Sequence, residues 1–125
     1  MQKTKIFFNI INTIFIVLYL YPGSILGFLV YGEFSKQPHL TEDFKLFSSN
    51  HVYGFAILSL IGLFAYYKSN KIFILNYLIF SSVILEILHL VVPNRSFQYS
   101  DLFGNILGVL ISILLLSVYN FWRKR

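Results

Sequence analysis

The chain is predicted to be an all-helical, polytopic membrane protein, a bundle of four transmembrane helices. Hydrophobic residues make up 57% of its 125 residues and charged residues only 12%, against about 45–50% and about 25% in typical soluble domains. The mean hydropathy is +0.70. A soluble fold of this size could not bury so much apolar surface. Because the charges fall between four uncharged stretches, we expect residues 1–125 to form a single membrane domain without a separate soluble part.

Each uncharged stretch is long enough to cross a hydrocarbon core of about 30 Å, which takes roughly 20 helical residues. The spans are expected near 6–31, 51–67, 72–92 and 102–122, with external loops at 32–50 and 93–100. Pro22-Gly23 should kink the first span or end it early, leaving Ile25 to Tyr31 as a second short segment. Pro93 should end the third span. None of the stretches shows the alternation of apolar and polar residues that is typical of membrane-spanning strands.

The distribution of Lys and Arg predicts the orientation, because positive residues are retained on the cytoplasmic side. Seven such residues have no acidic residue in the same segment: Lys3, Lys5, Lys68, Lys71, Arg123, Lys124 and Arg125. They precede the first span, separate the second from the third, and follow the fourth. We therefore expect a multi-pass protein of the cell membrane with both termini in the cytoplasm. A cleaved signal peptide is the alternative for the N-terminus, although its apolar run exceeds the usual 7–15 residues.

Two polar residues of the third span indicate a face that contacts protein. An acidic residue at mid-membrane costs about 2.5–3.5 kcal/mol, so Glu86 must be protonated, paired or exposed to a wet cavity. His89 follows three residues later and shares its helix face. Counted back from Pro93, Glu86 would lie roughly 10 Å below the external end of its helix. We expect this face to point away from lipid.

The fourth span carries a matching polar stripe. Its members lie within about 40° around the helix and are Asp101, Asn105, Gly108 and Ser112. Gly104 and Gly108 form a GxxxG pattern that allows close helix packing, extended by Ser112. A similar pattern, Gly23 to Gly27, occurs in the first span and would make self-association plausible as a homo-oligomer. The third and fourth spans should therefore meet through their polar faces.

His51, at the external end of the second span, and Arg95, in the last external loop, fall at the same level as this polar stripe. The whole set therefore predicts an outward-facing binding site. A purely structural interpretation stays open, in which Glu86 and Arg95 form an ion pair that pins the helical hairpin and Asp101 caps the fourth span. That interpretation explains less well why all these groups gather on one side of the membrane.

The polar residues form a pattern that resembles the VanZ-like family. The matching segments are Glu86-Ile-Leu-His89, Pro93-Asn-Arg95-Ser96 and Asp101-Leu-Phe-Gly-Asn105-Ile-Leu-Gly108, with a weaker match at His51-Val-Tyr-Gly-Phe55. The chain departs from the family pattern at His89, where Gln is usual, and at Ser112, where a second Gly is usual. An Asp-Lys pair that commonly precedes the span-two His is also absent. The resemblance implies a small polytopic protein of the cell envelope whose namesake gives low-level resistance to the glycopeptide antibiotic teicoplanin.

We favour a non-enzymatic protein that binds an anionic lipid head group or a lipid-linked cell-envelope compound. The expected ligand-binding residues are Glu86, His89, Arg95, Asp101, Asn105 and His51. Arg95 would contact the anion, because a planar guanidinium suits phosphate, with Glu86 and Asp101 holding it in place. One alternative is an intramembrane enzyme that uses Glu86 or His89 as general base. The other is a small proton-coupled exporter, although its buried Glu would be expected in the first span.

The composition excludes several other kinds of site. The chain has no cysteine, so it forms no disulfide and no thiolate metal site. Its basic residues are dispersed among the membrane edges, which argues against nucleic-acid binding. His51, Glu86 and His89 are the one set considered for an ion, and we expect neither a metal nor another cofactor.

Overall fold

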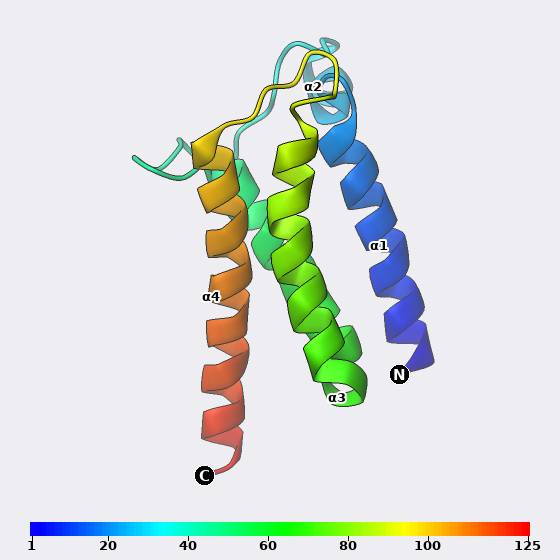
Figure 1. Cartoon of the computed structure of the whole chain (residues 1–125), viewed down its shortest axis with the longest axis vertical. Helices are drawn as coiled ribbons and strands as arrows, with labels where there is room; N and C mark the ends of the chain where they lie inside the picture. Colours follow the sequence, from blue (N-terminus) through cyan, green and yellow to red (C-terminus); the bar gives the residue numbers. More distant parts are fainter.

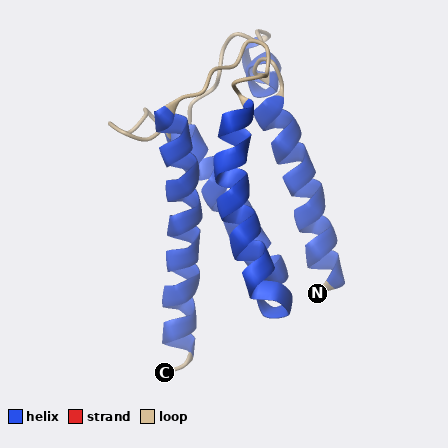
Figure 2. Ribbon diagram, in the orientation of Figure 1, coloured by secondary structure: helices blue, strands red, loops and turns tan.

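The computed structural model describes all 125 residues, and the chain is entirely helical apart from its turns and loops (Figure 2). In chain order the helices are α1 (Gln2–Leu20), α2 (Ile25–Tyr31), α3 (Ser49–Leu88) and α4 (Tyr99–Arg123). The predicted helical class is therefore confirmed. Three of the helices, α1, α3 and α4, are long and apolar enough to cross a membrane.

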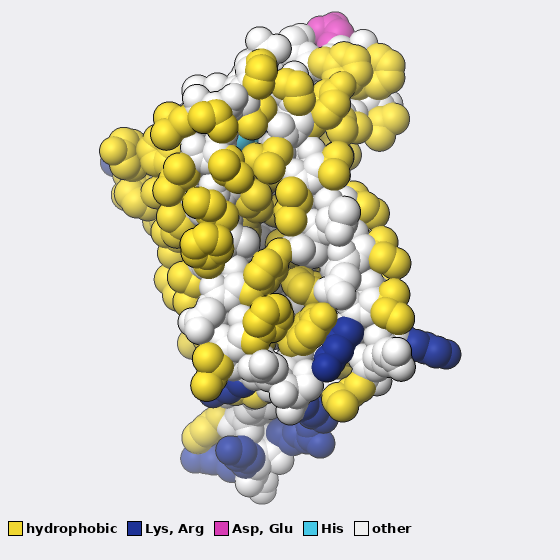
Figure 3. Space-filling model, turned by 45° about the vertical axis from the view of Figure 1, so that its right-hand side comes forward, with side chains coloured by type: hydrophobic (Ala, Val, Ile, Leu, Met, Phe, Trp, Pro, Cys, Tyr) yellow, Lys and Arg dark blue, Asp and Glu magenta, His cyan; other side chains and the backbone are white.

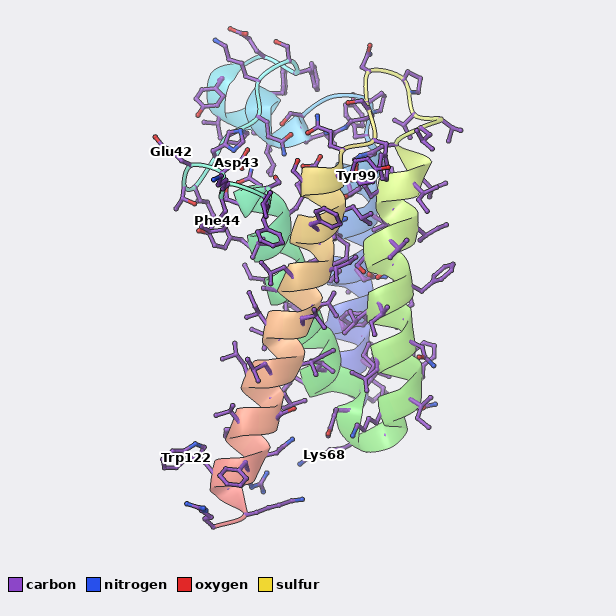
Figure 4. All side chains as sticks on the ribbon, turned by 60° about the vertical axis from the view of Figure 1, so that its left-hand side comes forward. Glu42, Asp43, Phe44, Lys68, Tyr99 and Trp122 are labelled. Carbon is purple, nitrogen blue, oxygen red and sulfur yellow. The ribbon has the colours of Figure 1, made fainter.

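The 40-residue helix α3 is a hairpin of two helical halves joined at Asn70. Asn70 has non-helical backbone angles (φ −157°, ψ 80°), and its side chain accepts a hydrogen bond from the Phe73 amide at 3.1 Å. Asn70 is thus the N-cap of the second half. The two halves, 49–69 and 71–88, run side by side in opposite directions, with Lys68 at the turn (Figures 1 and 4). The break predicted between residues 68 and 71 is real but is confined to one residue.

Helix α1 ends at Leu20 because Tyr21 precedes Pro22. A residue before proline is disfavoured in the helical region, and Tyr21 adopts φ −61° and ψ 136°. Gly23, with φ 149°, then turns the chain. Ser24 caps α2 by accepting a hydrogen bond from the Gly27 amide at 2.9 Å. The predicted early end of the first span, followed by a short second segment, is confirmed.

The interpretation of Gly23 and Gly27 as an exposed self-association face is wrong. Gly23 lies in the turn rather than on a helix. Gly27 packs against the backbone of the following loop, where an added Cβ would come within 1.5 Å of the Lys36 carbonyl oxygen. This glycine allows α2 to fold back onto its own loop, so the pattern provides no surface for a second copy of the chain.

Helix α3 ends earlier than predicted, at Leu88 instead of near Val92. The chain tightens before Pro93, since the Leu90 amide donates to the Ile87 carbonyl and the Val91 amide to the Leu88 carbonyl, at 3.0 and 3.1 Å. Such i to i+3 bonds satisfy the last carbonyls of a helix over a short distance. The expected depth of Glu86, counted from Pro93, is therefore also wrong, because Glu86 lies in the last turn of α3.

The interior is small and the exterior is apolar. Only 24 of the 125 residues are buried, and large hydrophobic side chains cover most of the visible face (Figure 3). The apolar core consists of Phe8, Phe55, Leu58, Leu63, Ala65, Ile74, Leu78, Leu85 and Val109. An outer surface of this kind suits a lipid environment. Both termini and the turn of α3 lie at one end, and we call the opposite end, which carries α2 and the connections 32–48 and 89–98, the loop end (Figure 1).

Candidate functional site

Six polar side chains from all three long helices meet near the loop end. We call this set the polar core, and its members are Tyr19, His51, Glu86, His89, Asp101 and Asn105. Glu86 and Asn105 are completely buried, and His89 is 3% exposed. The predicted site residues on α3 and α4 are thus brought together, and Glu86 faces protein as expected.

Glu86 is the most heavily bonded residue of the polar core. One carboxylate oxygen accepts hydrogen bonds from the Tyr19 hydroxyl at 2.5 Å and lies 3.2 Å from His89 Nδ1. The other oxygen accepts from the backbone amide of Gln98 at 2.9 Å. The early end of α3 allows this last contact, because the chain returns over Glu86 within twelve residues. Buried carboxylates need this number of donors to be tolerated in an apolar interior.

His89 faces hydrogen-bond acceptors with both ring nitrogens. Its Nε2 lies 2.8 Å from the backbone carbonyl oxygen of Tyr19, and its Nδ1 faces the Glu86 carboxylate. An imidazole carrying hydrogen on both nitrogens satisfies both contacts and forms a charged pair with Glu86. The ring also stacks on Tyr19, with centroids 4.7 Å apart. His89 therefore connects the end of α1 to the end of α3.

The donors and acceptors of Asn105 determine which ring nitrogen of His51 carries the hydrogen. The Asn105 amide nitrogen donates to the Ser82 carbonyl at 3.0 Å and to the Tyr19 hydroxyl at 2.7 Å. The amide oxygen of Asn105 must then accept from His51 Nδ1, 2.9 Å away. This assigns a hydrogen to Nδ1, while Nε2 of His51 faces Asp101 Oδ2 at 3.6 Å. Asp101 lies in the first turn of α4, where a carboxylate is favoured by the helix dipole.

Arg95 does not form the predicted ion pair with Glu86 and is not held by Asp101. Its Nε donates to the Tyr21 carbonyl at 3.0 Å, and its Nη2 donates to the carbonyls of Gly23 at 2.8 Å and Leu18 at 3.5 Å. These oxygens belong to the C-terminal end of α1 and the turn after it, where a cation is favoured. The structural interpretation based on a Glu86–Arg95 pair is therefore wrong, and Glu86 instead contacts His89, at the end of its own helix.

The small residues of α4 contact the first half of α3 rather than the second. A Cβ added to Gly104 would lie 2.8 Å from the Ser48 carbonyl oxygen, and one added to Gly108 would lie 2.5 Å from that of Val52. Ser112 donates to the Ala56 carbonyl at 2.8 Å. This close approach holds α4 at the depth where Asn105 reaches both halves of α3.

Tyr19 is the central residue that the sequence did not indicate. Its hydroxyl contacts Glu86, Asn105 and His51, so it links α1 to the other helices. A tyrosine hydroxyl within an apolar helix needs a partner when buried, which was the one available signal. That signal does not name the partner, because nothing in the sequence fixes the rotation of α1 relative to α3.

Two cavities meet at the polar core. One, of about 250 Å³, is lined by polar residues alone, among them Asp43, Asn94 and Asp101. The other, of about 490 Å³, is largely apolar and lies between α1 and the first half of α3, with Phe15, Leu18 and Ile57 in its wall. Six residues line both cavities: Gln37, His39, Asn50, His51, His89 and Arg95. We call the smaller cavity the polar chamber and the larger one the apolar groove.

Protein-family models, curated proteins and solved structures provide no match to this chain. The similarity of residues 86–112 to the VanZ-like pattern therefore remains a prediction from the sequence.

Proposed function

We propose that the chain is a non-enzymatic, VanZ-like membrane protein that binds an anionic membrane amphiphile, either a phospholipid or a lipid-linked cell-envelope compound. The polar chamber would take the head group. The single observation that carries the proposal is the junction of the polar chamber with the apolar groove at six shared residues. A site with a polar and an apolar compartment in contact matches a molecule built in the same way.

Arg95 supports the assignment of a negative head group. Its Nε and Nη2 are held by three backbone carbonyls, which fixes the guanidinium plane, while Nη1 has no hydrogen-bond partner in the protein. The residue lines both the polar chamber and the apolar groove. A preorganised guanidinium with free donors is suited to one oxygen of a phosphate.

The orientation of this site follows from the proposed topology of four membrane passes, with both termini in the cytoplasm. Each half of α3 has about the length needed to cross the hydrocarbon core of about 30 Å. Most Lys and Arg side chains of the visible face gather at the end that carries the termini and the α3 turn, and the visible acidic side chain lies at the loop end (Figure 3). This asymmetry supports a cytoplasmic location for that end. The polar chamber would then open to the outside.

Replacing Arg95 with alanine is expected to weaken binding of an anionic lipid by about tenfold to hundredfold, the loss that follows from removing a hydrogen bond to a charged group. The affinity of Arg95→Lys should fall between those of Arg95→Ala and the parent protein, because lysine keeps the charge without the planar guanidinium. The measurement is a titration of the purified protein with fluorescent phosphatidylglycerol and with a polyprenyl phosphate. Lys45→Ala, an exposed cation of the external loop, is the matched control.

A second variant tests the apolar groove without touching Arg95. Ile57 is 58% exposed and lines the groove, so Ile57→Trp should obstruct the chain of the ligand and weaken binding of both lipids. Inorganic phosphate, which has no chain, should bind equally to the variant and the parent protein. Unchanged lipid binding in both Arg95→Ala and Ile57→Trp, with the proteins still folded, would contradict the proposal.

A further inference from the structure

We propose that His51, Glu86 and Asp101 bind one divalent transition-metal ion, such as Zn²⁺, at the floor of the polar chamber. Each side chain offers one ligand atom, and these three atoms lie within 4.8 Å of one another. They come from the first half of α3, the second half of α3 and α4, so the folded helices assemble the set. It differs from the set considered from the sequence, because Asp101 takes the place of His89.

The hydrogen-bond pattern around His51 leaves the lone pair of Nε2 without a hydrogen-bond donor. Because Asn105 accepts from Nδ1 and the single hydrogen of the Tyr19 hydroxyl is committed to Glu86, the neutral ring has its hydrogen on Nδ1 and a lone pair on Nε2. That lone pair faces the Asp101 carboxylate at 3.6 Å. Two acceptors facing each other repel unless a cation lies between them.

The separation of the two acceptors suits a metal ion. Ligands of a tetrahedral Zn²⁺, with bonds of about 2.0–2.2 Å, are about 3.4 Å apart. The observed 3.6 Å between His51 Nε2 and Asp101 Oδ2 is close to this value and is longer than a normal hydrogen bond. A proton on Nε2 is the competing occupant, and it would favour a shorter contact.

Charge and lone-pair capacity favour the same assignment. No Lys or Arg forms an ion pair with Glu86 or Asp101, and Arg95 is engaged with carbonyls. The charge of a protonated His89 balances that of Glu86 and leaves the charge of Asp101 without a partner of this kind. A carboxylate offers about four lone-pair positions, and Glu86 uses three of them, for Tyr19, His89 and the Gln98 amide. One position therefore remains for a metal.

The surroundings supply the second shell and the entry path that a metal site needs. Asn105 holds His51 in the tautomer that presents Nε2, the way metal-binding imidazoles are commonly oriented. His51 and Asp101 both line the polar chamber, through which an ion can enter. Three protein ligands leave a fourth position open to the chamber, the arrangement of a zinc ion that accepts an exogenous ligand.

Titration of the purified, chelator-stripped protein with Co²⁺ tests the inference, with the visible d–d absorption as readout and Zn²⁺ as competitor. We expect one Co²⁺ per chain, with an absorption typical of four-coordination, displaced by stoichiometric Zn²⁺. Asp101→Asn, which keeps the shape of the side chain, and His51→Ala should each abolish stoichiometric binding. Circular dichroism and size-exclusion chromatography establish that these variants remain folded.

The exposed carboxylates Glu33 and Glu42 line neither cavity and serve as the control for adventitious binding. The double variant Glu33→Gln, Glu42→Gln should bind Co²⁺ like the parent protein. No Co²⁺ binding by the parent protein, or binding lost in the control but retained in Asp101→Asn, would overturn the metal site. Arg95→Ala should keep the metal while losing lipid, so failure of this inference is distinguishable from failure of the proposed function.

Discussion

Glu86→Ala is expected to lower the free energy of unfolding by about 3–5 kcal/mol, the usual loss when one partner of a buried charged pair is removed. The substitution leaves the Tyr19 hydroxyl, His89 Nδ1 and the Gln98 amide without their acceptor at a completely buried position. Helices α1 and α3 and the connection before α4 would lose their common contact. Reversible unfolding in mixed micelles, followed by circular dichroism, provides the measurement.

Two variants calibrate this result. Glu86→Gln keeps the shape of the side chain but places an amide group against one of the donors, so an intermediate loss of about 1–3 kcal/mol is expected. Glu42→Ala removes an exposed acidic residue at the loop end and should change stability by no more than about 0.5 kcal/mol. A Glu86→Ala protein as stable as Glu42→Ala would mean that the polar core does not hold the helices together.

Gly108→Leu should destabilise the protein by about 3 kcal/mol, at the upper end of the range for overpacked interiors. The new side chain would meet the Val52 carbonyl and the Ala56 amide, 2.5 and 2.8 Å from the position of its Cβ. Because both contacts are backbone, α4 has to move away from α3. That movement would break the hydrogen bond from Ser112 to Ala56 and withdraw Asn105 from His51.

A matched substitution on the same helix separates this packing effect from a change in composition. Ser117 is exposed, and Ser117→Leu introduces the same side chain on the outer face of α4; its stability should match the parent protein within about 0.5 kcal/mol. The free energies of unfolding of both variants, measured in mixed micelles by circular dichroism, give the comparison. Equal stability of Gly108→Leu and the parent would contradict the close approach of α4 to α3.

The sequence predicted those features that the cost of burying charge determines. Glu86 is the one acidic residue of a stretch without Lys or Arg, so it had to face protein, and the stripe through Asp101 and Asn105 had to meet it. Pro22 and Gly23 act through local backbone geometry, which is why the end of α1 and the start of α2 were also predicted. Each of these inferences depends on a few neighbouring residues and on the lipid solvent.

The partners within the polar core depend on three-dimensional packing and could not be read in the same way. Arg95 had two acidic residues at similar depth, yet it lies over the end of α1 and bonds to carbonyls. The sequence did not reveal that α3 ends at Leu88, a change that brings the Gln98 amide to Glu86. Tyr19 was missed because the rotation of α1 relative to α3 depends on packing between segments that are far apart in the sequence.

The proposed function requires that the polar core opens, through the polar chamber, to the external aqueous phase. Because the chain has no cysteine, single cysteines at Ser96, in the wall of the polar chamber, and at Ser69, beside the turn of α3, can be labelled in intact cells with a membrane-impermeant thiol reagent. We expect Ser96→Cys to be labelled from outside and Ser69→Cys to be labelled only after the cells are permeabilised. Labelling of Ser69→Cys in intact cells, with Ser96→Cys protected until permeabilisation, would contradict it.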